Sequence, residues 1–179
     1  MSGQWWRRNR WGLVALVPAL ALAFYAPIHD FQERYWFGKP HQPLSAAPGG
    51  WVDYADARMR LVDMRDVTTQ VTDYDDKPFK LPAGVRVWSA TLEFVAADSD
   101  KIIGCQLTME SAAGSTFEAN PNELFGADLR YAGCTPGGIG TPPPQYKTVA
   151  YFVLPSTARP VAVRVALATK LPRYARLTP

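Results

Sequence analysis

Apolar and polar residues alternate with a period of two in several segments after residue 51. Side chains along a β-strand point to opposite faces in turn, so each of these segments predicts a strand with one buried face. The residues expected to face the core are Trp88, Ala90, Leu92 and Phe94 in one segment, Ile103, Cys105, Leu107 and Met109 in the next, and Val161, Val163, Val165 and Leu167 in a third. No segment after residue 51 carries a sustained helical stripe, so the folded part is expected to be all-β.

Further strands are expected elsewhere in the same part of the chain. They lie at residues 57–67 and 147–154 and in short segments near Val52, Phe117 and Arg173. Clusters of proline, glycine and aspartate separate the segments and predict tight turns. About seven short strands joined in this way are typical of an antiparallel, immunoglobulin-like β-sandwich, and a closed barrel is the alternative.

Residues 11–28 form an uncharged apolar run of 18 residues, WGLVALVPALALAFYAPI. A helix of this length measures roughly 27 Å, which matches the hydrocarbon thickness of a bilayer. Arg7, Arg8 and Arg10 precede the run, and basic residues mark the cytoplasmic side of a membrane helix. The sequence therefore predicts a single-pass cell-membrane protein with a cytoplasmic N-terminus and an extracytoplasmic C-terminal domain.

A cleaved secretory signal is the alternative for the same segment. Ala21, Leu22 and Ala23 have the small-x-small form that signal peptidases accept. An uncleaved anchor is favoured because the apolar run continues past this point. Both alternatives place the folded part outside the cytoplasm.

These segments give the predicted domain organisation. Residues 39–50, KPHQPLSAAPGG, contain three prolines and end in two glycines, which predicts an extended linker. The four expected parts are a cytoplasmic N-terminus at 1–10, a transmembrane signal-anchor helix at 11–28, a juxtamembrane segment and linker at 29–50, and the extracytoplasmic sandwich at 51–179.

The net charge locates the basic excess outside the predicted domain. The formal charge of +3 equals the contribution of Arg7, Arg8 and Arg10, and the rest of the chain carries equal numbers of basic and acidic residues. A domain without net positive charge lacks the electrostatic footprint of a polyanion binder. Nucleic acid is therefore not expected as a partner.

Charge is nevertheless uneven within the predicted domain. All 16 acidic residues lie before residue 129, and residues 129–179 carry only basic ones. One hypothesis is that Lys170, Arg173 and Arg176 form a basic patch that meets anionic lipid headgroups or wall polymer. The alternative is that cross-strand ion pairs neutralise the two halves.

The two cysteines, Cys105 and Cys134, both lie in the part expected outside the cytoplasm. A disulfide between them is expected in an oxidising compartment. The only histidines, His29 and His41, lie before the predicted domain, which excludes histidine-dependent catalysis and histidine-bound zinc within it. No cofactor is expected.

Two segments offer candidate binding sites. Asp73, Asp75 and Asp76 crowd one turn and are a weak calcium candidate, with a solvated turn as the favoured alternative. Residues 120–145 are long for a plain connection, and long ordered loops are often functional. The candidate binding-loop residues are Phe125, Tyr131 and Tyr146, and the alternative is a passive crossover.

Three segments carry a resemblance to known proteins. They are Gly-Trp-Val-Asp-Tyr-Ala at 50–55, Val-Trp-Ser-Ala-Thr-Leu-Glu-Phe at 87–94 and Gly-Cys at 104–105. Together with the arginine-rich anchor, they resemble uncharacterised membrane-anchored proteins of high-GC Gram-positive bacteria. The resemblance implies an extracytoplasmic immunoglobulin-like domain and implies no active site.

Three functions follow as hypotheses. The first is a non-enzymatic accessory or interaction domain that binds an envelope component, with a protein in the same membrane as the expected partner. The second is a secreted or anchored hydrolase that uses the acidic loops of the sandwich. The third is an extracytoplasmic ligand sensor.

Overall fold

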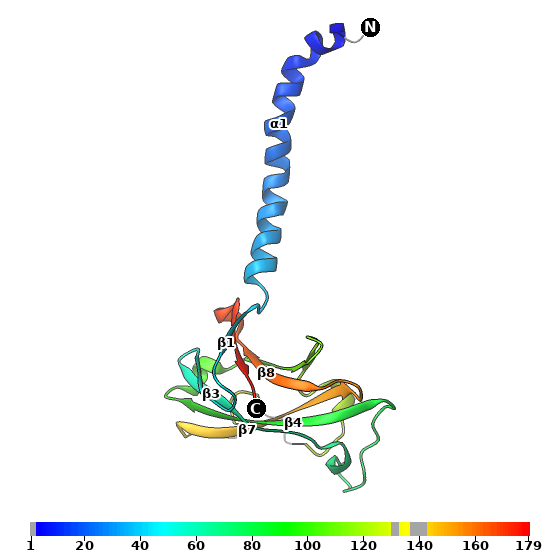
Figure 1. The fold of residues 1–179 in the computed structure, drawn as a ribbon, viewed down its shortest axis with the longest axis vertical. Helices are drawn as coiled ribbons and strands as arrows, with labels where there is room; N and C mark the ends of the chain where they lie inside the picture. The colour runs from blue at the N-terminus through cyan, green and yellow to red at the C-terminus, as the bar shows by residue number, and fades with distance from the viewer. Residues whose placement is uncertain (1–2, 130–132, 137–142) are drawn as a thin grey trace. The chain divides into compact units, whose positions relative to one another are not determined.

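The computed structural model describes residues 3–129, 133–136 and 143–179, in two compact units, Met1–Lys39 and Pro40–Pro179. The first unit contains the helix α1 (Gly3–Gln32), followed by the π-helical turn η1 (Glu33–Phe37) (Figure 1). Large apolar side chains along α1, such as Val17 and Leu22, are exposed. The segment Asn9–Phe37 contains an 18-residue window with a mean hydropathy of 1.9, which is long and apolar enough to cross a membrane or to serve as a signal sequence.

The second unit is an all-β sandwich, as the sequence predicts. A five-stranded sheet has the order β1-β9-β8-β5-β6, and a four-stranded sheet has the order β2-β3-β4-β7. The strands of the first are β1 (Gln42–Ser45), β9 (Arg173–Leu177), β8 (Pro160–Ala166), β5 (Gln106–Ser111) and β6 (Thr116–Glu118). Those of the second are β2 (Val52–Tyr54), β3 (Ala57–Asp66), β4 (Val85–Ala96) and β7 (Gln145–Pro155). Short 3-10 turns connect them: η2 (Thr68–Gln70), η3 (Ser99–Ile102), η4 (Asn122–Leu124) and η5 (Ala168–Lys170).

The core lies between the two sheets and follows the alternation of the sequence. In β4, Ala90, Leu92 and Phe94 are fully buried, and Trp88 packs against the same cluster. The facing sheet contributes Met109 from β5 and the buried valines of β8. Burial of these side chains is the main stabilising contribution to such a domain.

The structure corrects the predicted linker at 29–50. Helical structure continues through Phe37, and β1 lies inside the segment expected to be linker. The sandwich unit therefore begins at Pro40 rather than at residue 51. The sequence does not predict this strand because Pro43 lies within it. An edge strand tolerates proline, because the N–H groups on its outer side have no partner strand to bind.

Strand β1 also departs from the expected antiparallel arrangement. It pairs in parallel with β9, with Gln42 opposite Arg173, whereas the other strand pairs are antiparallel. The described residues form nine strands, where about seven were expected. Of these strands, β1 is the one for which the sequence analysis predicted no segment.

The strand predicted from Ile103 onward begins later than expected. Gly104 adopts a left-handed φ of 75°, and the backbone turns there before β5 starts at Gln106. Ile103 is 60% exposed, and Ile102 is buried in its place. A positive φ suits glycine, which has no Cβ to clash, so the turn interrupts the alternation.

Two long loops cover part of the outer face of the four-stranded sheet and form a second apolar cluster. The loop between β3 and β4 contributes Val67 and Val71, and the loop after β6 contributes Leu124 and Ala127, around Val87 of β4. The loops are joined because the N–H of Asp128 donates to the carbonyl of Thr72 at 2.8 Å. This cluster holds both loops against the sheet.

The sheet edges are short or covered. Three of the four edge strands contain three or four residues, and β7 is the long one. Asn120 pairs with β7: its N–H donates to the carbonyl of Tyr151 at 2.7 Å, and its side-chain oxygen accepts the N–H of Tyr151 at 3.3 Å. The chain after β6 therefore closes one side of the sandwich.

Candidate functional site

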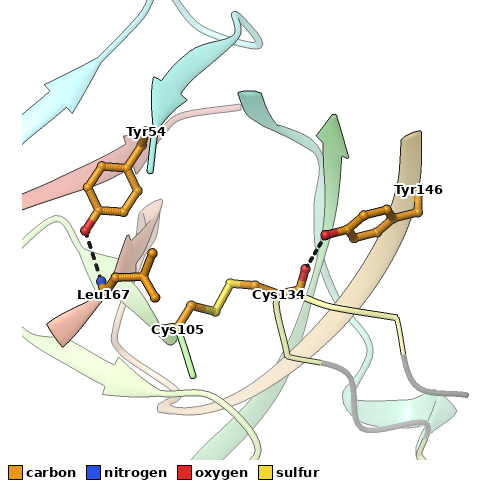
Figure 2. Close-up of a disulfide and its surroundings, with 5 residues drawn as sticks. All are labelled: Tyr54, Cys105, Cys134, Tyr146 and Leu167. Atoms are coloured by element: carbon orange, nitrogen blue, oxygen red, sulfur yellow. Dashed lines mark hydrogen bonds between the residues drawn. A yellow bond between two sulfur atoms is a disulfide. The ribbon is translucent and has the colours of Figure 1, made fainter. Parts of the chain in front are cut away.

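Cys105 and Cys134 form a disulfide, as predicted from their placement in the sequence. Cys105 directly precedes β5, and Cys134 lies in the long loop before β7 (Figure 2). Their Cα atoms are 6.1 Å apart, within the range that a disulfide spans. The bond fixes the long loop to the five-stranded sheet.

Tyr146, a predicted binding residue, is instead a buried support of this loop. Its hydroxyl donates to the carbonyl of Cys134 at 3.0 Å, and its ring stacks on Phe94 with centroids 5.6 Å apart (Figure 2). Burial raises the pKa of the phenol. Because only 7% of Tyr146 is exposed, it offers no surface to an external ligand.

Tyr54 joins the two sheets near the same disulfide. Its hydroxyl donates to the carbonyl of Arg173 and accepts the N–H of Leu167, both at 3.0 Å (Figure 2 shows the second bond). Burial raises the pKa of this phenol against the opposing effect of the Leu167 hydrogen bond. Sequence reasoning did not single out Tyr54, whose partners lie more than 110 residues away.

The other two residues of the predicted binding loop have different outcomes. Phe125 is 90% exposed, although its neighbour Leu124 is fully buried in the second apolar cluster. Tyr131 lies outside the described residues. The structure therefore leaves Phe125 as the accessible member of the predicted set and assigns Tyr146 to the main core.

The acidic turn is built by its own side chains. The carboxylate of Asp73 accepts the backbone N–H groups of Asp75 and Lys77, each at 2.9 Å. The carboxylate of Asp75 pairs with the ammonium of Lys77 at 3.2 Å. Among the described residues, no group of three His, Cys, Asp or Glu side chains is placed to hold a metal ion. Asp73 thus has a local structural role in closing the turn.

The predicted basic patch is divided between an exposed turn and a paired strand. Lys170 and Arg173 are exposed and line a hollow of about 400 Å³, together with Asp53 and Asp56. Arg176 lies elsewhere, on the outer face of the five-stranded sheet, where it binds a carboxylate. The structure therefore removes Arg176 from the predicted patch.

Glu110 neutralises two arginines on that outer face. Arg176 donates two hydrogen bonds to its carboxylate, at 3.0 and 3.1 Å, and Arg164 donates one at 2.8 Å. The Arg176 hydrogen bonds hold the pKa of Glu110 below its ordinary value; burial opposes this effect, and Arg164 adds to it. The carboxylate in turn raises the pKa of Arg176. This is the cross-strand pairing that the uneven charge suggested as an alternative.

We expect the Glu110→Gln variant to lose about 2 kcal/mol of unfolding free energy at neutral pH, because two partly buried guanidinium groups lose their charged acceptor. The effect should depend on pH. The folded-state pKa of Glu110 is lowered, so its stabilisation is present above the unfolded-state pKa of about 4.3 and is lost as the pH falls through the folded-state pKa. Urea denaturation between pH 7 and pH 3 measures this as a smaller difference between the two proteins in acid.

Asp75→Asn is the matched control for this prediction. Asp75 is exposed and pairs with an exposed lysine, so its loss should change the unfolding free energy by less than about 1 kcal/mol. An equal effect of the two substitutions, or a difference between wild type and Glu110→Gln that grows in acid, would contradict the assigned role of Glu110.

The outer face of the four-stranded sheet carries a row of charged residues at its uncovered end. Arg60, Glu93 and Lys147 stand directly opposite one another on β3, β4 and β7. Glu93 accepts hydrogen bonds from Gln145 and Arg60, and these bonds, in that order, hold its pKa below the ordinary value. The guanidinium of Arg60 also lies 4.8 Å from the ring centre of Trp51.

A groove of about 250 Å³ lies on this face between the second apolar cluster and the Glu93 row. Its floor comes from β4 and β7, and its sides come from β3 and the two covering loops. The hydrogen-bonding side chains that line it are Arg65, Gln70, Ser89, Thr91, Asp128 and Tyr151. The sequence did not single out these residues, because they come from five separate segments that only strand register and loop packing bring together.

Comparison with known proteins finds similarity among solved structures. No protein-family model matches the chain, and no curated protein is significantly similar to it. Among solved structures, an uncharacterized beta-sandwich protein from Clostridium difficile 630 is similar, with 9% sequence identity and a TM-score of 0.42. The match covers 78% of this chain and 95% of that chain.

Proposed function

We propose that the protein is a non-enzymatic, single-pass membrane protein whose β-sandwich lies outside the cytoplasm and binds another component of the cell envelope. The observation that carries the proposal is that one chain combines a 30-residue helix, which contains an uncharged apolar run of 18 residues, with a β-domain that holds a disulfide. A helix of this kind is long enough to span a bilayer. A disulfide persists in an oxidising compartment, which lies on the far side of that bilayer.

The basic residues at the N-terminal end of the helix support the proposed orientation. Arg7, Arg8 and Arg10 precede the apolar run, and basic residues favour the cytoplasmic side. The proposal therefore extends the resemblance to membrane-anchored, immunoglobulin-like surface proteins of high-GC Gram-positive bacteria. In this view the helix serves as an anchor for the sandwich.

Anionic lipid headgroups belong to the proposed contacts of the domain. The N–H groups of His41 and Gln42 donate to the carbonyl of Pro172, next to the exposed Arg173. Lys170 and Arg173 are the exposed basic residues proposed for this contact, and each basic residue near anionic headgroups contributes about 1 kcal/mol of attraction.

A binding role is favoured over the hydrolase alternative. The two loops on the four-stranded sheet are held by their own apolar cluster, yet they leave Phe125 almost fully exposed. An exposed aromatic side chain on a fixed loop is typical of a contact residue in a protein interface. The acidic turn, in contrast, uses Asp73 to bind its own backbone.

Membrane extraction and protease protection test the proposed topology. The full chain, with an N-terminal epitope tag, should stay in membranes washed with carbonate. Protease added outside intact protoplasts should degrade the sandwich and spare the tag. Replacing Leu16 and Leu20 together with arginine should release the chain, because a charged residue at mid-membrane costs about 3 kcal/mol, whereas alanine at both positions should not.

The same preparation separates the anchor from a cleaved signal and tests the partner. Recovery of the protein only in the medium, with Phe24 as its first residue, would contradict the anchor. Cross-linking in intact cells, followed by mass spectrometry, should identify an envelope component that is lost with Phe125→Ala. Ile103→Ala, which removes an exposed apolar side chain outside the two loops, should keep that component.

A further inference from the structure

The floor of the groove on the four-stranded sheet is a regular part of the sheet. Arg65, Ser89 and Tyr151 stand opposite one another on β3, β4 and β7, and Thr91 stands opposite Val149 in the next outward row. Strands about 4.8 Å apart make this floor roughly 10 Å wide. Its shape is therefore set by backbone hydrogen bonds rather than by loop conformation.

The side of the groove formed by the loops is equally well fixed. The N–H of Val67 donates to the carbonyl of Val87 at 2.9 Å, and the N–H of Val87 donates to the hydroxyl of Thr68 at 2.9 Å. Asp128 is held by its backbone bond to Thr72. A site with fixed walls binds a ligand without a large cost for ordering itself.

The groove holds more hydrogen-bonding groups than the protein uses. Within the part of the chain that the structure describes, no side-chain hydrogen bond forms at Gln70, Ser89, Thr91, Asp128 or Tyr151. Ser89 lines the groove although the residue as a whole is only 5% exposed. Polar groups that line an open groove and have no partner within the protein can bind water or the hydroxyl groups of a ligand.

The chemistry of these groups points to a neutral, polyhydroxylated ligand. Arg65 and Asp128 line the groove with one positive and one negative charge, and Arg65 also pairs with Asp63 at 3.5 Å, so the groove has no positive excess that would favour an anion. The hydroxyl groups of Ser89, Thr91 and Tyr151 can each donate and accept hydrogen bonds, and so can the hydroxyl groups of a sugar. Val149 and the ring of Tyr151 add apolar surface that suits the C–H face of a sugar ring.

We propose that this groove binds a neutral sugar unit. Its volume of about 250 Å³ is below the range of roughly 300–1,000 Å³ for drug-sized ligands, which suits a single ring. The loops bound the groove on one side, and the outward row that follows Thr91 along β4 is that of Glu93. A longer glycan would therefore extend toward the Glu93 row. This inference specifies a ligand for the proposed envelope-binding function and rests on it for the setting in which the sugar is met.

Direct binding to the purified full chain tests the proposal. The chain should be solubilised in a zwitterionic detergent, because many mild detergents carry a sugar headgroup that would compete. The probes are glucose, galactose, mannose and N-acetylglucosamine, each as the free sugar and as a short homo-oligomer, observed by saturation-transfer NMR. At least one should bind, and tighter binding of its oligomer would identify a glycan chain as the source.

Matched variants locate the binding. Asp128→Ala and Tyr151→Phe should each weaken the affinity about 10-fold, which corresponds to about 1.4 kcal/mol. Asp75→Ala and Tyr74→Phe remove the same groups from exposed positions outside the groove and should leave the affinity unchanged. Hydrogen exchange of β4 and β7 in each variant checks that the sandwich is intact.

Three results would overturn the assignment. They are no binding by any probe, equal affinity in the groove variants and wild type, or tighter binding of glucuronate or glucosamine than of the matching neutral sugar. The assay does not depend on membrane insertion. Loss of the anchor with retained sugar binding would therefore contradict only the proposed function, and an anchored chain without sugar binding would contradict only this inference.

Discussion

We expect the Phe94→Ala variant to lose about 3–5 kcal/mol of unfolding free energy. Phe94 is fully buried between the sheets, and its ring stacks on Tyr146. Alanine would leave a cavity that the sheets cannot close, because backbone hydrogen bonds fix β4 to its neighbouring strands. Since domains of this size unfold at a cost of about 5–15 kcal/mol, the variant should lie close to global unfolding. Pulse proteolysis of the detergent-solubilised full chain across a urea series measures the change.

Two substitutions control for this result. Phe94→Leu keeps most of the side-chain volume and should cost less than about 1.5 kcal/mol. Phe125→Ala removes the same ring from an exposed position and should cost less than about 0.5 kcal/mol. A loss at Phe94 no larger than that at Phe125 would show that the ring does not fill the core.

The second large effect is expected at the disulfide. Replacing Cys105 and Cys134 together with alanine should lower the unfolding free energy by about 3–4 kcal/mol, because a cross-link over 29 residues restricts the unfolded chain. Alanine avoids placing a hydroxyl at Cys134, which is buried. Thermal unfolding should shift down by about 10 °C for a domain of this size.

Reduction provides an independent check on the same bond. A reductant should move the urea midpoint of the wild-type protein toward that of the double variant and should leave the variant unchanged. If the wild type and the double variant unfold at the same urea concentration, the disulfide does not stabilise the sandwich. Both proteins are measured as the detergent-solubilised full chain, as for the Phe94→Ala variant.

The local pattern of the sequence predicts the inner faces of the long strands. In β4, Ala90, Leu92 and Phe94 are buried, as alternation requires. The disulfide was predictable because the chain has two cysteines and both follow the apolar segment at residues 11–28. These predictions depend on residues near in sequence or on composition, which a single sequence contains.

Other features depend on residues that are distant in sequence. Arg176 meets Glu110 across 66 residues, so the sequence could suggest pairing but not name the partner. The groove combines Ser89 of β4 with Tyr151 of β7 and Asp128 of a loop, and no local pattern links them. Strand β1 was not predicted because its proline argues against a strand unless the strand lies at a sheet edge. Only the order of strands in the sheet shows that β1 lies there.

The short and covered edges bear on behaviour at high density. Proteins held on one membrane are confined to a thin layer, which raises their effective concentration relative to free solution. Exposed strand edges would then template edge-to-edge association and aggregation. In this sandwich, β1, β2 and β6 are each only three or four residues long, and Asn120 blocks part of β7. The domain is thereby protected against polymerising with its neighbours when many copies share a surface.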